Sequence, residues 1–152
     1  MEHKKSFRIV GISVETTNEN NQALIDLGKL WGDFYTKNIA EKIPNKNSED
    51  IYAVYTDYES DYTGKYTAII GFCVDTFDEV PNDFTKREFK EGVYQKFIAK
   101  GKMPDVIGET WNEIWKKEEE LDRNYIADFE IYGKKSQNGD ASEVEIFIGV
   151  NN

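Results

Sequence analysis

Two strand-like segments near the C-terminus each carry a glutamate beside an aromatic residue. Because alternate residues of a strand share a face, Glu130 lies on the same face as Tyr132, and Glu145 on the same face as Phe147. A carboxyl group enclosed by apolar rings has a raised pKa, so it can accept a proton or pair with a cation. The residues alone leave two alternatives open for these glutamates, a solvent-exposed sheet face and the floor of a cleft.

The two segments, residues 125–132 and 143–150, form a closing hairpin across a loop that contains Gly133 and Gly139. The other face of each segment is wholly apolar, and we expect both apolar faces to pack on a helix. These faces comprise Tyr125, Ala127, Phe129 and Ile131 in the first segment and Val144, Ile146, Ile148 and Val150 in the second.

This hairpin belongs to a plan that occurs twice along the chain. Trp31 and Tyr35 are four residues apart, and Trp111 and Trp115 repeat that spacing 80 residues later. Trp31 lies on the apolar stripe of one amphipathic helix, and Trp111 and Trp115 lie on that of another, where core packing is the ordinary role of such residues. A strand-like run precedes each helix and two more follow it. The sequence therefore predicts a strand–helix–strand–strand unit that is present twice.

We expect one α+β domain over residues 1–152, built from two modules that form an antiparallel sheet with two long helices. Module one covers about residues 6–75, a linker about 76–86 and module two about 88–150. The predicted strands are residues 7–14, 51–55, 66–75, 90–99, 125–132 and 143–150, and the predicted helices are about 23–34 and 104–115. The seam between two like modules is where we expect a ligand cleft.

Composition limits the kinds of partner and chemistry. The chain has 19 basic and 29 acidic residues, a net charge of −10, which disfavours direct binding to nucleic acid or to an anionic membrane. We expect a soluble, cytoplasmic protein, because there is no secretory signal and no run of 18 apolar residues. The single cysteine, Cys73, lies in an apolar run and reads as a small buried residue. With one histidine, His3, and one cysteine, we expect no histidine-based triad and no metal site. We also expect no cofactor, since the chain has no nucleotide-binding fingerprint.

Four short segments resemble signatures of the GyrI-like small-molecule-binding domain, the effector-binding part of multidrug-sensing transcription activators of the AraC and MerR types. They are Asp128-Phe-Glu-Ile-Tyr132, Val144-Glu-Ile-Phe-Ile-Gly-Val150, Glu91-Gly-Val-Tyr94, and the hairpin from Tyr52–Tyr58 through Tyr66–Gly71. The resemblance runs over nearly the whole chain. It implies two modules related by a pseudo-twofold axis, with a cleft between them that is lined by aromatic residues and holds a central glutamate.

The resemblance also implies the site residues. Glu130 matches the glutamate of the Phe-Glu-x-Tyr motif, Glu145 that of the last strand, and Tyr94 the tyrosine of the Gly-x-Tyr strand. Trp111 falls at the aromatic position of the second helix motif, whereas we expect its counterpart Trp31 to pack in the core. The remaining candidates for the cleft wall are Tyr132, Phe147, Tyr55 and Phe72.

Three functions are consistent with these residues. The first is a stand-alone effector-binding-like domain that captures lipophilic compounds, cationic or electrophilic. The second is a hydrolase that opens cyclopropane rings of genotoxic natural products, with Glu130 or Glu145 as general base and Tyr94 as proton donor. The third is a gyrase-inhibitor-like module that binds a protein partner. The DNA-binding helices of the regulators are not visible in the sequence, so we expect no direct contact with DNA.

Overall fold

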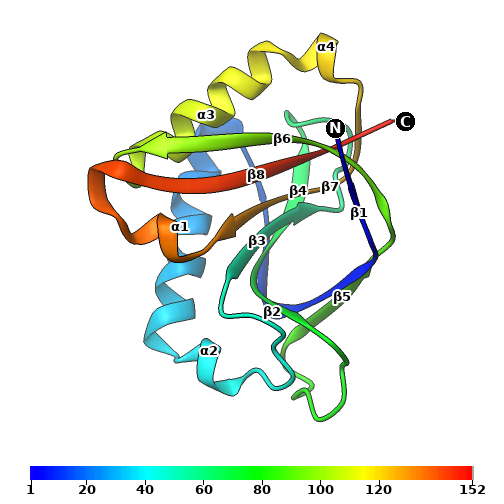
Figure 1. Ribbon diagram of the computed structural model, residues 1–152, viewed down its shortest axis with the longest axis vertical. Coiled ribbons are helices and arrows are strands. Elements are labelled where there is room, and N and C mark those ends of the chain that lie inside the picture. Colours follow the sequence, from blue (N-terminus) through cyan, green and yellow to red (C-terminus); the bar gives the residue numbers. More distant parts are fainter. Residues whose placement is uncertain (152) are drawn as a thin grey trace.

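The computed structural model describes residues 1–151 and contains an eight-stranded antiparallel sheet that curls around itself (Figure 1). The strands are β1 (Glu2–Lys4), β2 (Phe7–Thr17), β3 (Ile51–Thr56), β4 (Lys65–Val74), β5 (Thr85–Phe89), β6 (Gly92–Gly101), β7 (Arg123–Tyr132) and β8 (Ser142–Val150). The helices are α1 (Gln22–Thr36), α2 (Ile39–Lys42), α3 (Asp105–Lys116) and α4 (Glu118–Leu121). None of these helices combines the length and apolarity that a membrane span requires.

The strand order confirms the α+β fold of two like modules. Across the sheet the order is β1-β6-β8-β7-β3-β4-β2-β5, so β6, β8 and β7 of one module mirror β2, β4 and β3 of the other. The modules meet where β3 pairs with β7, and one short extra strand lies at each edge. Both long helices cover the same face of the sheet, α1 over one module and α3 over the other.

The connection from β5 to β6 explains the curl. These strands lie near opposite edges of the sheet, yet only Lys90 and Glu91 link them. Three Cα–Cα steps span at most about 11 Å, so the two edges must approach each other. We expected a strand over residues 90–99, whereas β6 begins at Gly92 and β5 already occupies Thr85–Phe89. The strand begins later than predicted because the chain must leave the sheet edge at β5 before it can join the opposite side as β6.

Apolar residues form a core on each face of the sheet. On the helix-covered face, Leu30 and Phe34 of α1 pack on β2 and β4, and Val106 and Ile114 of α3 pack on β8. The opposite face lies inside the curl and is filled by a core that includes Ile9, Val54, Ile69, Cys73, Tyr94, Phe129 and Phe147. The prediction that both apolar faces of the closing hairpin pack on a helix is therefore wrong for β7, whose Ala127 and Phe129 face the inside of the curl.

Replacement of glycine by alanine should have opposite effects on stability at Gly71 and at Gly28. Gly71 pairs with Gly11 across β2 and β4, and a Cβ on Gly71 would lie 2.0 Å from the carbonyl oxygen of Val10. Gly71→Ala should therefore lower the free energy of unfolding by roughly 2 kcal/mol or more. Gly28 lies inside α1 with nothing near its Cβ position, so Gly28→Ala should raise that energy by up to about 1 kcal/mol. Urea unfolding of both variants measures the contrast, and a wild-type midpoint for Gly71→Ala would contradict it.

Candidate functional site

Glu130 lies at the centre of the sheet, where the two modules meet. It is on β7, directly across from Ala53 on β3, and its side chain is buried on the helix-covered face with 1% of the residue exposed. Tyr55 and Tyr132 donate their hydroxyls to Oε1 of Glu130 at 3.0 and 2.7 Å. The indole Nε1 of Trp111 on α3 donates to Oε2 at 2.6 Å. Three neutral donors from three different elements thus hold one buried carboxyl group.

The environment of this carboxyl group is apolar and lacks a cation. Burial raises the pKa of Glu130, and the hydrogen bonds from Tyr132, Trp111 and Tyr55 partly oppose that rise. Within residues 1–151, no lysine or arginine forms an ion pair with Glu130. A buried carboxylate without a counter-ion is costly, so this group is suited to hold a proton or to receive a cation.

Aromatic rings surround the carboxyl group. Trp111 packs edge-on against Tyr55, with ring centroids 5.7 Å apart, and Trp31 of α1 packs edge-on against Tyr132 at 5.1 Å. Trp31 also contacts the core residue Phe34, so it belongs both to the core and to this ring of aromatics. The sequence analysis assigned it to the core alone, although its spacing of 80 residues from Trp111 was a signal that the two have equivalent places.

The sequence analysis missed a second buried carboxyl group on the same face. Asp128 precedes Glu130 by two residues on β7 and is fully buried. It accepts hydrogen bonds from Arg123 Nη2 and from the Tyr58 hydroxyl, both at 2.5 Å, and from the backbone N–H of Gly149 at 2.8 Å. Burial raises the pKa of Asp128, and the adjacent guanidinium opposes that rise. Asp128 therefore has an internal cation, whereas no cation of residues 1–151 pairs with Glu130.

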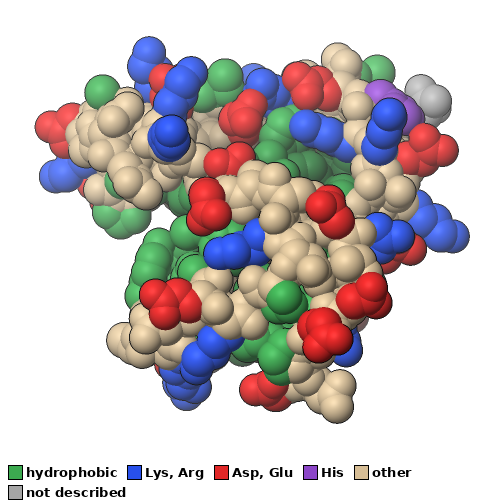
Figure 2. Space-filling view, turned by 60° about the horizontal axis from the view of Figure 1, so that its bottom comes forward, with side chains coloured by type: hydrophobic (Ala, Val, Ile, Leu, Met, Phe, Trp, Pro, Cys, Tyr) green, Lys and Arg blue, Asp and Glu red, His purple; other side chains and the backbone are tan. Residues whose placement is uncertain are grey.

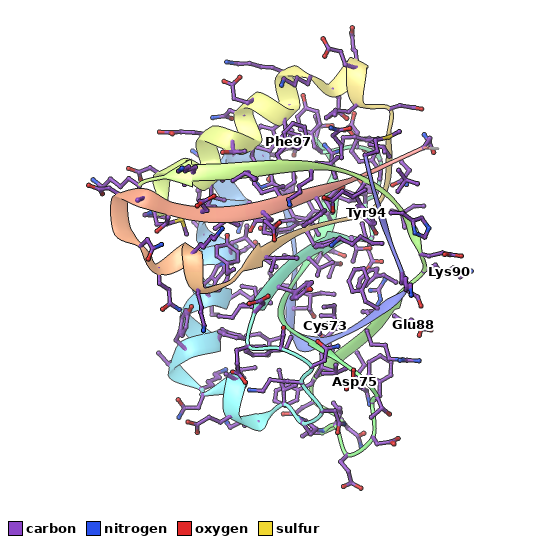
Figure 3. All side chains as sticks on the ribbon, viewed as in Figure 1. Cys73, Asp75, Glu88, Lys90, Tyr94 and Phe97 are labelled. Carbon is purple, nitrogen blue, oxygen red and sulfur yellow. The ribbon has the colours of Figure 1, made fainter. Side chains whose placement is uncertain are left out.

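Glu145, Phe147 and Tyr94 lie on the other face of the sheet. The register of β7 and β8 pairs Glu130 with Ile146, so the flanking residues of β8 point away from Glu130. Tyr94 and Phe147 are buried in the core inside the curl, where Figure 3 labels Tyr94 together with Cys73. The structure thus does not bring Tyr94 or Glu145 together with Glu130.

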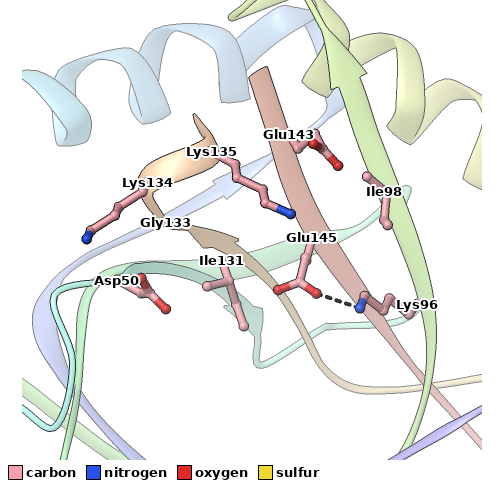
Figure 4. A pocket seen from close by; sticks show the side chains of 9 residues that line it. All are labelled: Asp50, Lys96, Ile98, Ile131, Gly133, Lys134, Lys135, Glu143 and Glu145. Atoms are coloured by element: carbon pink, nitrogen blue, oxygen red, sulfur yellow. Dashed lines mark ion pairs between the residues drawn. The ribbon is translucent and has the colours of Figure 1, made fainter. Parts of the chain in front are cut away.

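Glu145 forms an ion pair with Lys96, with Oε2 and Nζ 2.6 Å apart, and 42% of its side chain is exposed (Figure 4). The pair lines a shallow pocket of about 300 Å³ whose other charged residues are of both signs: Asp50, Lys134, Lys135 and Glu143. Acidic and basic side chains are also interspersed on the face in Figure 2, so the net negative charge is not gathered in one patch there. Phe72 lies on the helix-covered face but packs against Phe34 in a tilted arrangement, at 5.8 Å between centroids. Of the eight predicted residues, the structure brings together Glu130, Tyr55, Trp111 and Tyr132.

Glu130→Gln should change the dependence of stability on pH. A raised pKa in the folded state means that the contribution of Glu130 is fully present below its unfolded pKa of about 4.3 and is lost as pH rises through the folded pKa. Glutamine has no proton to lose. The free energy of unfolding of the wild type should therefore fall relative to the variant as pH rises from about 4 to 8. Urea unfolding across that range measures this difference, and a constant difference would contradict the prediction.

Comparisons with known proteins agree with this fold. The family described as integron-associated effector binding protein matches residues 1–150. The crystal structure of the Vibrio cholerae integron cassette protein VCH_CASS2 is 32% identical, with a TM-score of 0.74, and the match covers 99% of this chain and 94% of that one. The structure of SAV2435 bound to tetraphenylphosphonium is 20% identical, with a TM-score of 0.81, over 100% of this chain and 95% of that one. The Bacillus subtilis (strain 168) protein YobU, whose name proposes a role as a transcriptional regulator, is 23% identical over 94% of this chain and 91% of its own length.

Proposed function

Because this chain belongs to the family of integron-associated effector-binding proteins and has a GyrI-like effector-binding fold, we propose that it binds lipophilic organic cations at Glu130. The observation that carries this proposal is a buried carboxyl group held only by neutral donors, Tyr55, Tyr132 and Trp111. The family makes the chain a small-molecule-binding domain, and the charge and surroundings of Glu130 select the class of molecule.

The physical argument is one of charge compensation in an apolar place. A buried carboxylate is strongly stabilised when a cation comes within a few ångströms, because little water is present to screen the attraction. The rings of Tyr55, Tyr132 and Trp111 add cation–π attraction, which contributes on the order of 2 kcal/mol or more once the cation is desolvated. A cation with apolar substituents also gains from leaving water. Inorganic cations and strongly hydrated amines lack that gain.

Entry of a ligand requires the rings to move. The indole of Trp111 occupies one oxygen of the carboxyl group, and Glu130 is almost completely buried. A bound cation then replaces the indole N–H of Trp111, which hydrogen-bonds the carboxyl group of Glu130 in the free protein. Tryptophan fluorescence should report this exchange, because Trp111 changes its hydrogen-bond partner.

SAV2435, of similar fold, was solved with tetraphenylphosphonium, and this cation is a suitable probe. Titration of the protein with tetraphenylphosphonium, followed by calorimetry and tryptophan fluorescence, should give saturable binding at one site. Tetraphenylborate has the same shape and the opposite charge, so it serves as the matched control. Equal binding of cation and anion, or no binding of the cation, would overturn the proposal.

A further inference from the structure

The pseudo-twofold axis of the fold passes close to Glu130. Ala53 of β3 and Glu130 of β7 are paired directly across the junction of the modules. Two residues after each of them comes a tyrosine, Tyr55 in one module and Tyr132 in the other. Both tyrosine hydroxyls donate to the same oxygen of Glu130, from opposite sides of the junction. The carboxyl group is therefore flanked symmetrically.

The tryptophans extend this symmetry. Trp31 and Trp111 occupy equivalent places on α1 and α3, 80 residues apart. Each packs edge-on against the tyrosine of the other module, Trp111 against Tyr55 at an interplanar angle of 87° and Trp31 against Tyr132 at 71°. Two aromatic pairs of the same kind thus stand on the two sides of one carboxyl group, and each pair joins both modules.

A glycine precedes both tryptophans by about one helical turn. Gly28 and Gly108 each precede one of the tryptophans by three residues, and a Cβ at either position would meet nothing within 4 Å. A glycine inside a helix costs about 1 kcal/mol relative to alanine, and here close packing does not require it. Both glycines are exposed to solvent, so each module has a small residue at the surface one helical turn before its tryptophan.

The aromatic rings are arranged symmetrically about the pseudo-twofold axis, but only one of the two modules has a carboxyl group there. Ala53, with 1% of its surface exposed, stands where the other module has Glu130. The site therefore has a single negative charge near its axis and an aromatic wall on each side. A ligand that matches this arrangement has one positive charge between two aromatic groups.

We propose that the site is two-sided: it selects cations whose charge lies between two aromatic groups, one held by Trp111 and Tyr55 and the other by Trp31 and Tyr132. This inference rests on the proposed function and adds Trp31 as a ligand-contacting residue. Cations with their charge at one end can place an aromatic group against only one wall.

Two isomeric cations test this selectivity. Dibenzyldimethylammonium has its charge between two rings, and (biphenyl-4-ylmethyl)trimethylammonium has the same atoms with the charge at one end. The two-sided isomer should bind at least 10-fold more tightly in calorimetric titration. Equal affinities, including no measurable binding of either isomer, overturn the inference. Because tetraphenylphosphonium tests the proposed function separately, failure of the inference is distinguishable from failure of that function.

Variants of Trp31 test the second wall. Trp31→Leu should weaken the two-sided isomer about 10-fold and the one-sided isomer less than 3-fold, and Trp31→Phe should restore most of the affinity. Leu24→Ala, an exposed change on the same helix, should affect neither isomer. Circular dichroism and thermal unfolding check that each variant is folded. Equal weakening of both isomers by Trp31→Leu would assign Trp31 to packing and overturn its role as a contact. If that variant does not fold, an unchanged preference in Trp31→Phe supports the inference and a lost preference overturns it.

Discussion

Glu130→Gln should weaken the binding of tetraphenylphosphonium by at least about 30-fold. Removal of one partner of a desolvated charge pair costs 2 kcal/mol or more, and each tenfold change in affinity corresponds to about 1.4 kcal/mol. Glutamine has nearly the same shape: its amide oxygen can accept the hydrogen bond from Trp111, while its NH2 group donates to the hydroxyls of Tyr55 and Tyr132. The variant thus removes the charge and keeps the site. Calorimetry with wild type and variant at neutral pH measures the change.

Glu145→Gln is the matched control. It makes the same chemical change on the neighbouring strand, but Glu145 lies on the opposite face and is paired with Lys96. Its effect on binding should be less than about 3-fold, since a screened charge on the far face contributes little. Equal losses in both variants would point to a general effect of net charge rather than to a site at Glu130.

Arg123→Met should lower the free energy of unfolding by about 3–5 kcal/mol. The side chains of Arg123 and Asp128 are 1% and 0% exposed, and Nη2 and Oδ2 are 2.5 Å apart. Loss of the guanidinium leaves a buried carboxylate without its cation, the costly outcome for a broken internal ion pair. Arg123 also bonds Glu118 of α4, at 3.2 Å, so the variant further loosens the segment that joins α3 to β7. Urea unfolding measures the loss.

Two further variants separate charge from packing. Arg123→Met combined with Asp128→Asn has no buried charge at this place, so it should be more stable than Arg123→Met alone. Arg87 pairs with Asp57 through two hydrogen bonds, at 2.9 and 2.8 Å, but about a third or more of each side chain is exposed. Arg87→Met should therefore cost less than about 1 kcal/mol. If Arg123→Met lowers the free energy of unfolding no more than Arg87→Met does, the buried ion pair of Arg123 and Asp128 does not stabilise the fold as predicted.

The sequence predicted the two-module architecture, but not the edge strands β1 and β5 or the curl of the sheet. The pattern of apolar residues and the return of Trp31 and Tyr35 as Trp111 and Trp115 predict two like modules with one long helix each. These signals are local: strand and helix periodicity is determined by the neighbours along the chain. For the same reason, alternation along β7 was enough to place Glu130 and Tyr132 on one face.

The assembled site depends on tertiary structure. Alternation tells which residues of one strand share a face, but the register between strands decides which faces coincide. That register turns Glu145 away from Glu130, although the sequence presents the two glutamates alike.

The buried ion pair between Asp128 and Arg123 also could not be predicted from strand alternation. Arg123 lies an odd number of residues from Asp128, so ideal alternation separates their side chains. A break in the pairing of β7 with β8 between these residues, with a left-handed backbone at Tyr125 (φ 54°), brings them together. The residue types were thus readable from the chain itself. Which carboxyl group acquired a cation was decided by the break in strand pairing, because strand alternation alone does not place Arg123 beside Asp128.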